Sequence, residues 1–150
     1  MRKFLFTCLF FGLGILAKAQ IQNPVQWTFS AKKINATTYE IHMSAAIAGK
    51  WHMYSQTTPE GGPLPTTIEF SKNPLVTLEG TAKEVGKLQQ KHEPLFGVDV
   101  KQYGSKLDFV QTVKLKSPVK TTVAGTIEFM VCDDTQCLPP STQKFSIPLK

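Results

Sequence analysis

Short runs in which apolar and polar residues alternate recur along most of this chain, separated by turn residues. Alternation with a period of two is the pattern of a β-strand that buries one face. The clearest runs are residues 25–29, 39–45, 107–115, 123–131 and 145–149. Beyond the amino-terminal segment, the sequence shows no amphipathic helical pattern. Many short strands without helices predict an all-β fold, an antiparallel β-sandwich.

The length of the chain and its irregular segments indicate one domain. The 150 residues are enough for a single hydrophobic core, and we find no internal repeat and no long linker. Residues 56–65, rich in Pro, Gly and Thr, are predicted to form a loop. Residues 75–78 are predicted to form a short strand, and the polar residues 82–90 an edge strand. We therefore expect one domain over residues 20–150.

The first nineteen residues have the composition of a secretory signal peptide. A basic start is followed by an apolar run over residues 4–16 and by Ala17-Lys18-Ala19, which places small residues at the cleavage-defining positions. The apolar run is shorter than the roughly 20 residues that span a bilayer. We expect cleavage after Ala19, with loss of Cys8 and no membrane span in the mature chain. A lipid-modified Cys8 is the weaker alternative, because its neighbours suit lipoprotein cleavage poorly.

Charge argues against a nucleic-acid partner. The whole chain has 17 basic and 11 acidic residues, a net charge of +6. Removal of residues 1–19 takes away Arg2, Lys3 and Lys18 and no acid, so 14 basic residues remain against 11 acidic, or +3. The remaining basic residues are scattered and form no patch, so we expect no nucleic-acid surface.

Two cysteines remain in the expected mature chain, Cys132 and Cys137, which leaves one possible pairing. They flank the polar residues 133–136, which suit a hairpin turn between strands. Opposed strand residues have Cα atoms about 4.5–5.5 Å apart, within the roughly 4.4–6.8 Å that a disulfide needs. Export would supply an oxidising compartment, where such a pair forms a disulfide unless something reduces it.

The alternation also predicts where the first cysteine lies. Phe129 and Val131 share the inward parity of their strand, and Cys132 has the opposite parity. We therefore expect Cys132 outside the core, at the end of the strand, where it becomes reachable once any covering segment moves.

The short ring leaves two roles open for the disulfide. Under the loop-entropy model a ring of about six residues stabilises a fold by only about 2 kcal/mol, against about 4–5 kcal/mol for a loop of a hundred. The pair is thus either a weak structural staple or a redox pair in thiol–disulfide exchange. Spacing alone does not decide, since C-x4-C is not the C-x-x-C motif of thioredoxins.

Three segments resemble the N-terminal periplasmic domain of the thiol:disulfide interchange protein DsbD. Cys132 to Cys137 followed by Leu138-Pro139-Pro140 resembles the active-site segment of that family. Residues 50–56 resemble the aromatic strand beside the cysteines, and residues 92–97 resemble the cap loop that shields them. The best-known members carry one more residue between the cysteines, and their cap loop is longer by one residue and more acidic.

The resemblance implies an immunoglobulin-like sandwich in the periplasm that acts as a protein-disulfide reductase without a cofactor. It implies that Cys132 and Cys137 are catalytic and that Cys137 forms the mixed disulfide with partners. The electron donor would be a thioredoxin-like protein or a membrane transporter of the DsbD or CcdA type. The acceptors would be periplasmic disulfide isomerases or cytochrome c maturation proteins.

The resemblance also suggests residues around the cysteines. It implies that the cap loop, with Glu93, Leu95 and Phe96, forms a lid over the disulfide. Taken alone, the apolar pair Leu95 and Phe96 would more readily tuck into the core. The resemblance likewise implies that His52 and Tyr54 border the cysteines. Without the resemblance, we would place both side chains on the solvent-facing surface of their strand, opposite its core residues.

Asp133 and Asp134 allow two compatible interpretations. Both residue types are ordinary turn formers. Negative charge beside a thiol also raises its pKa, and no His or Lys lies within the turn to offset it. We therefore expect the reduced pair to react slowly until a partner docks.

The two cysteines also fit two other classes of function. A metal site could combine Cys132 and Cys137 with one of His42, His52 or His92, but structural zinc usually takes four ligands with paired, closer cysteines. Since the sequence offers no second pair, we expect no metal. The alternative to a redox module is a non-catalytic immunoglobulin-like binding or adaptor module whose disulfide only pins the hairpin.

Overall fold

The computed structural model describes residues 23–150, which fold into strands joined by turns and loops. The strands are β1 (Val25–Lys33), β2 (Thr38–Ile47), β3 (His52–Tyr54), β4 (Thr67–Phe70), β5 (Val76–Glu93), β6 (Val98–Leu115), β7 (Thr121–Phe129), β8 (Val131–Cys132) and β9 (Ser141–Leu149). Residues 23–150 contain no helix, and hence none that is long and apolar enough to cross a membrane. The predicted signal peptide over residues 1–19 and Cys8 lie outside the described residues.

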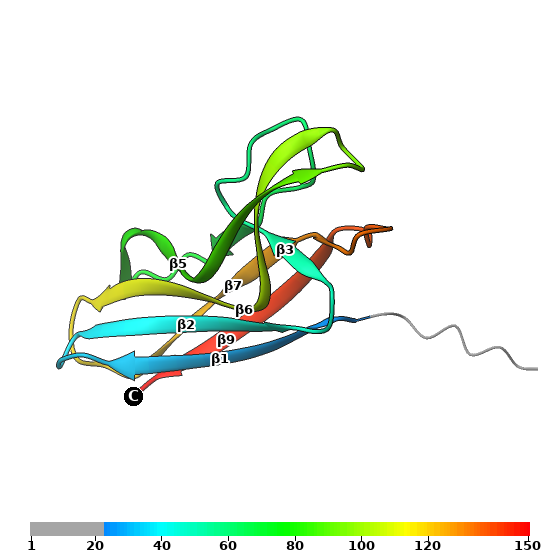
Figure 1. The fold of residues 1–150 in the computed structure, drawn as a ribbon. Coiled ribbons are helices and arrows are strands. Elements are labelled where there is room, and N and C mark those ends of the chain that lie inside the picture. The colour runs from blue at the N-terminus through cyan, green and yellow to red at the C-terminus, as the bar shows by residue number, and fades with distance from the viewer. Residues whose placement is uncertain (1–22) are drawn as a thin grey trace, which may run out of the picture.

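The strands form two antiparallel sheets that face each other (Figure 1). In the larger sheet the order is β1-β2-β6-β3-β8, and β5 also pairs with β6. In the smaller sheet the order is β4-β7-β9. Every pairing is antiparallel, so the predicted all-β antiparallel sandwich is confirmed.

The core lies between the sheets and is built from the alternating residues that the sequence singled out. Met43, Phe109 and Ile127 are fully buried, and their strands expose or half-expose the residues between. Gln111 is the polar member of the alternating run over residues 107–115 and is also buried. Its Nε2 donates hydrogen bonds to the carbonyl oxygens of Glu79 (3.0 Å) and Thr112 (2.8 Å), so its burial leaves no unsatisfied amide donor there.

The strands β5 and β6 form one hairpin of eighteen residues on each side, whereas the alternation predicts only separate pieces over residues 75–78, 82–90 and 107–115. The register shifts between Glu79 and Lys83 and between Gly86 and Leu88. Such bulges add residues that break the period of two and bend the strand. The distal part of the hairpin consequently rises out of the sandwich above β3 (Figure 1).

The loop over residues 56–65, predicted from its composition, lies against this hairpin. Gln56 N–H donates to Glu84 Oε1 at 2.7 Å, next to a hydrogen bond of 2.7 Å from Ser55 Oγ, just before the loop, to Glu84 Oε2. Thr58 Oγ1 donates to the carbonyl of Lys101 at 3.1 Å and accepts from its backbone N–H at 2.8 Å. The distal hairpin is therefore supported from one side by hydrogen bonds to this loop.

Candidate functional site

A disulfide joins Cys132 and Cys137 across a tight turn. The two residues form an antiparallel bridge with Cα atoms 4.0 Å apart, slightly closer than the sequence-based expectation. Asp133 N–H donates to the carbonyl of Gln136 at 2.9 Å, and Leu138 N–H donates to that of Val131 at 2.9 Å. The predicted four-residue turn is thus confirmed.

Between β7 and the turn, the chain changes sheets. The strand β7 belongs to the smaller sheet and ends at Phe129, whereas β8 pairs with β3 in the larger sheet. On the return, β9 pairs with β7 from Ser141 onward. The turn that carries the disulfide is therefore anchored in both sheets.

The structure places Cys132 at the end of β8 and outside the main core, as predicted. Phe129 and Val131 are buried in the main core, and Cys132 is itself completely covered by other residues. It packs with Tyr54 and Val100 in a second, smaller apolar cluster. Parity correctly separated Cys132 from the main core, but it could not reveal a second cluster on the other face. Cys137, in contrast, is partly exposed.

The strand β3 places two aromatic side chains beside the disulfide. His52 is the register partner of Cys132, and Tyr54 belongs to the cluster around that cysteine. Both side chains are buried, so the solvent-facing placement considered for them is wrong. The rest of the segment behaves as expected, with Met53 fully buried and Trp51 packed against the main core.

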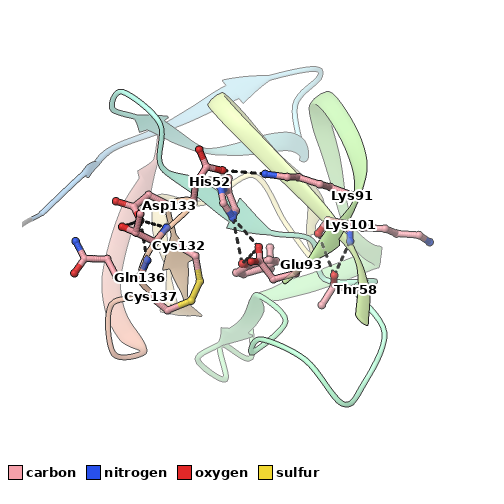
Figure 2. A network of polar contacts seen from close by, with 12 residues as sticks. His52, Thr58, Lys91, Glu93, Lys101, Cys132, Asp133, Gln136 and Cys137 are labelled. Atoms are coloured by element: carbon pink, nitrogen blue, oxygen red, sulfur yellow. Dashed lines mark hydrogen bonds and ion pairs between the residues drawn. A yellow bond between two sulfur atoms is a disulfide. The ribbon is translucent and has the colours of Figure 1, made fainter. Parts of the chain in front are cut away.

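Glu93 forms a buried polar group with these two residues, and only 2% of its surface is exposed. Tyr54 OH donates to Glu93 Oε2 at 3.0 Å, and His52 Nε2 lies 3.3 Å from the same oxygen (Figure 2). Burial above all, and then the hydrogen bond and charge of Glu93, raise the pKa of Tyr54. The phenol therefore stays protonated and donates a hydrogen bond to the carboxylate.

For Leu95 and Phe96 the sequence left two placements open, a lid over the disulfide or burial in the core. Leu95 and Phe96 lie in the turn of the β5–β6 hairpin and are 48% and 37% exposed, so they do not tuck into the core. The apolar side chains packed around the cysteines come from the following strand residues Val98 and Val100, together with Met130. Sequence analysis missed these two valines, although their alternation with Asp99 was a signal for a strand.

The two aspartates of the turn have different partners. Asp133 Oδ1 accepts hydrogen bonds from the backbone N–H groups of Thr135 and Gln136, both at 2.8 Å, which makes it a turn former as predicted. These hydrogen bonds hold the pKa of Asp133 below its ordinary value. The pKa of Asp134 is also lowered, because Lys91 Nζ lies 3.0 Å from its Oδ1. Lys91, distant in sequence, therefore offsets part of the negative charge that was expected to be uncompensated.

The Lys91–Asp134 ion pair connects the β5–β6 hairpin to the turn that carries the cysteines. We expect Lys91→Gln to raise the rate of disulfide reduction by dithiothreitol roughly two- to five-fold at low salt, since an exposed pair holds two segments only weakly. The gain should shrink as salt screens the pair in the parent protein. Lys87→Gln, which removes the same charge from the same strand, is the matched control. Equal acceleration in both variants would attribute the effect to net charge and contradict a role for the ion pair.

Of the three histidines considered for a metal set with the cysteines, His52 lies beside Cys132, whereas the other two pair with carboxylates. His42 Nδ1 lies 2.7 Å from Asp108 Oδ2, and His92 Nδ1 lies 3.0 Å from Asp99 Oδ1. Within residues 23–150, no group of three or more His, Cys, Asp or Glu side chains is placed to hold a metal ion.

The described residues form an all-β sandwich that carries a disulfide in a short turn, and the family that matches the chain makes it a thiol:disulfide interchange module. The family model described as "Thiol:disulfide interchange protein DsbD, N-terminal" matches residues 18–149. The chain therefore belongs to the DsbD N-terminal family, and the resemblance seen in its three motifs is confirmed. No curated protein sequence matches the chain.

Solved structures share this fold at low identity. The N-terminal periplasmic domain of ScsB from Proteus mirabilis aligns with a TM-score of 0.57 and 16% identity over 85% of this chain and 47% of that one, so this chain spans about half its length. The reduced DsbD N-terminal domain of Neisseria meningitidis aligns with a TM-score of 0.53 and 15% identity, over 83% and 84%. The DsbD N-terminal domain in complex with the PilB N-terminal domain, also from N. meningitidis, gives 0.50 and 12%, over 85% and 87%. The immunoglobulin-like fold is thereby confirmed.

Proposed function

We propose that this protein is an exported protein-disulfide reductase that relays electrons through the Cys132–Cys137 pair. A thiolate of a reduced partner attacks one sulfur and forms a mixed disulfide, which the second thiol of the partner then resolves. The pair is left as a dithiol, and it reduces an acceptor disulfide by the same steps in reverse.

The unequal exposure of the two cysteine residues carries this proposal. Cys137 is partly exposed, whereas Cys132 is fully buried. An attacking thiolate needs access to one sulfur and a neighbouring sulfur that leaves. Cys137 is therefore the attacked residue, and Cys132 is the leaving group. A staple would need neither the partial exposure nor the short ring, which stabilises the fold little.

The proposed partners follow from membership of the family. The donor is a thioredoxin-like protein or a membrane transporter of the DsbD or CcdA type, and the acceptors are disulfide isomerases or cytochrome c maturation proteins of the periplasm. The structure of the N. meningitidis DsbD N-terminal domain with the PilB N-terminal domain supports a protein partner for such a domain. In this proposal Leu95 and Phe96 form the lid beside Cys137, and a docking partner displaces it.

The reduction potential of the pair tests the proposal directly. The mature protein is equilibrated with reduced and oxidised thioredoxin, and free thiols are alkylated and counted by intact mass. We expect rapid exchange and a potential near that of thioredoxin, about −270 mV. A potential below about −300 mV, with no exchange, would make the disulfide a staple and favour the adaptor module.

A further inference from the structure

The side chain of His52 lies where the reaction of Cys132 needs a proton. His52 and Cys132 are register partners on the neighbouring strands β3 and β8, so their side chains are on the same face of the sheet. Directly opposed residues of an antiparallel pair have Cβ atoms about 4.5–5.5 Å apart. Both residues are buried, so Cys132 is shielded from solvent and its register partner is an imidazole.

We propose that His52 is the proton donor and acceptor for Cys132, and that Glu93 positions it. This inference rests on the proposed thiol–disulfide exchange and adds a third side chain to its chemistry. It also assigns a task to the buried carboxylate, which an exchange reaction between sulfurs alone does not require.

The hydrogen bonds of the site determine which ring nitrogen is free. Tyr54 donates its only proton to Glu93 Oε2, so the phenol oxygen faces His52 as an acceptor. His52 Nε2 lies 3.2 Å from that phenol oxygen and 3.3 Å from Glu93 Oε2. Between two acceptors, Nε2 must carry a hydrogen. Nδ1 is the remaining ring nitrogen, and it is the atom that gains and loses the proton.

Several charged or titratable groups face the ring of His52. Glu93 contacts the ring directly from β5, and the Tyr54 phenol next to it is neutral. The pKa of Asp134 is lowered mainly by its ion pair with Lys91 and less by the charges of Lys50 and His52. Glu93 is thus the carboxyl group in direct contact with the ring, and it holds the ring in place.

The proposed reaction proceeds in balanced steps. The partner thiolate attacks Cys137 Sγ, the Cys132–Cys137 bond breaks, and its electron pair stays on Cys132 Sγ. A thiolate in an apolar cluster is costly, so protonated His52 gives its Nδ1 proton to Cys132 and becomes neutral. The second partner thiolate then attacks the partner sulfur in the mixed disulfide and releases the Cys137 thiolate to solvent. When the module reduces an acceptor, the Cys137 thiolate first attacks the acceptor disulfide, which forms a mixed disulfide and releases one acceptor thiolate. Neutral His52 then takes the proton from Cys132, whose thiolate attacks Cys137 Sγ, restores the Cys132–Cys137 bond and expels the second acceptor sulfur as a thiolate. Solvent protonates the two acceptor thiolates.

Dithiothreitol reduction of the oxidised protein, measured across pH, tests this role. The rate is divided by the concentration of dithiothreitol thiolate, which removes the titration of the reagent. In the parent protein the corrected rate should fall between about pH 5 and pH 8, where imidazole loses its proton. In His52→Gln it should be flat with pH and about tenfold lower at the acid end, less than most general-acid effects because a thiolate leaves readily.

Two variants sharpen the test. His42→Gln is the matched control, because His42 also pairs with a carboxylate but lies on β2, and its profile should match the parent. Glu93→Gln keeps a hydrogen-bonding side chain and removes the charge, so the fall in corrected rate should move to lower pH. If His52→Gln does not fold, the ring of His52 in the parent protein is titrated by NMR in both redox states. A different titration curve in each state is expected, and identical curves would overturn the proposal.

The outcomes separate this inference from the proposed function. A parent protein whose disulfide exchanges with neither thioredoxin nor dithiothreitol would remove both. A parent protein that exchanges rapidly while His52→Gln keeps the same rate and pH profile would overturn only the role of His52.

Discussion

Replacement of Cys132 by Ala is expected to leave a reactive thiol at Cys137, whereas replacement of Cys137 by Ala is expected to leave an unreactive one at Cys132. The reason is exposure, since Cys137 is partly accessible and Cys132 is completely buried. Each variant is incubated with glutathione disulfide, and the glutathione adduct is followed by intact mass. We expect adduct formation to be at least about ten times faster in Cys132→Ala, because access governs which sulfur reacts.

The same pair of variants tests the structural value of the disulfide. Both should lose exchange with thioredoxin completely and keep the fold, because a ring of about six residues contributes only about 2 kcal/mol. Urea unfolding followed by tryptophan fluorescence measures the loss. A Cys137→Ala protein that is unfolded at room temperature would contradict this small contribution. Faster adduct formation at Cys132 would reverse the assignment of the attacked sulfur.

Replacement of Gly125 by Ala should have the largest effect on stability. Gly125 lies in β7 between Phe70 of β4 and Phe145 of β9 in the smaller sheet. A Cβ at this position would overlap the carbonyl oxygen of Glu69 and lie 2.6 Å from Phe145 Cζ. Overpacking of a core usually costs about 1–3 kcal/mol, and a clash with backbone cannot be relieved by a rotamer change, so we expect a loss of about 3 kcal/mol or more.

Gly104→Ala is the matched control for this prediction. Gly104 is also a strand glycine, in β6, but a Cβ there meets only the Trp51 carbonyl oxygen, at 3.9 Å. Urea unfolding should show a change of about 0.5 kcal/mol or less, as for substitutions that meet no obstacle. Similar losses in the two variants would mean that glycine flexibility, not the clash at Gly125, determines the cost.

The sequence predicted the fold class because the buried faces follow a strict period of two. Tyr39, Ile41 and Met43 are buried in succession, as their alternation required. The prediction was poorest where that period breaks. The bulges after Glu79 and Gly86 shift the parity within β5, so the long hairpin was not apparent as one unit.

The candidate site was predictable only in part, for a related reason. The three motifs identified Cys132, His52 and Glu93, and these residues do lie together. The burial of Cys132 depends on the change of sheet after Phe129, which leaves no mark in the local sequence. The ion pair with Lys91 depends on the curvature of the hairpin. Both are tertiary features, and no spacing rule encodes them.

The anchoring of the cysteine turn in both sheets has a consequence for biogenesis. The turn is held by β3 on one side and by the β7–β9 pairing on the other, so backbone pairing fixes its position in addition to the sulfur–sulfur bond. The chain can therefore reach its native structure before any oxidase acts on it. Folding would then bring the two cysteines together, and oxidation would follow the fold instead of directing it.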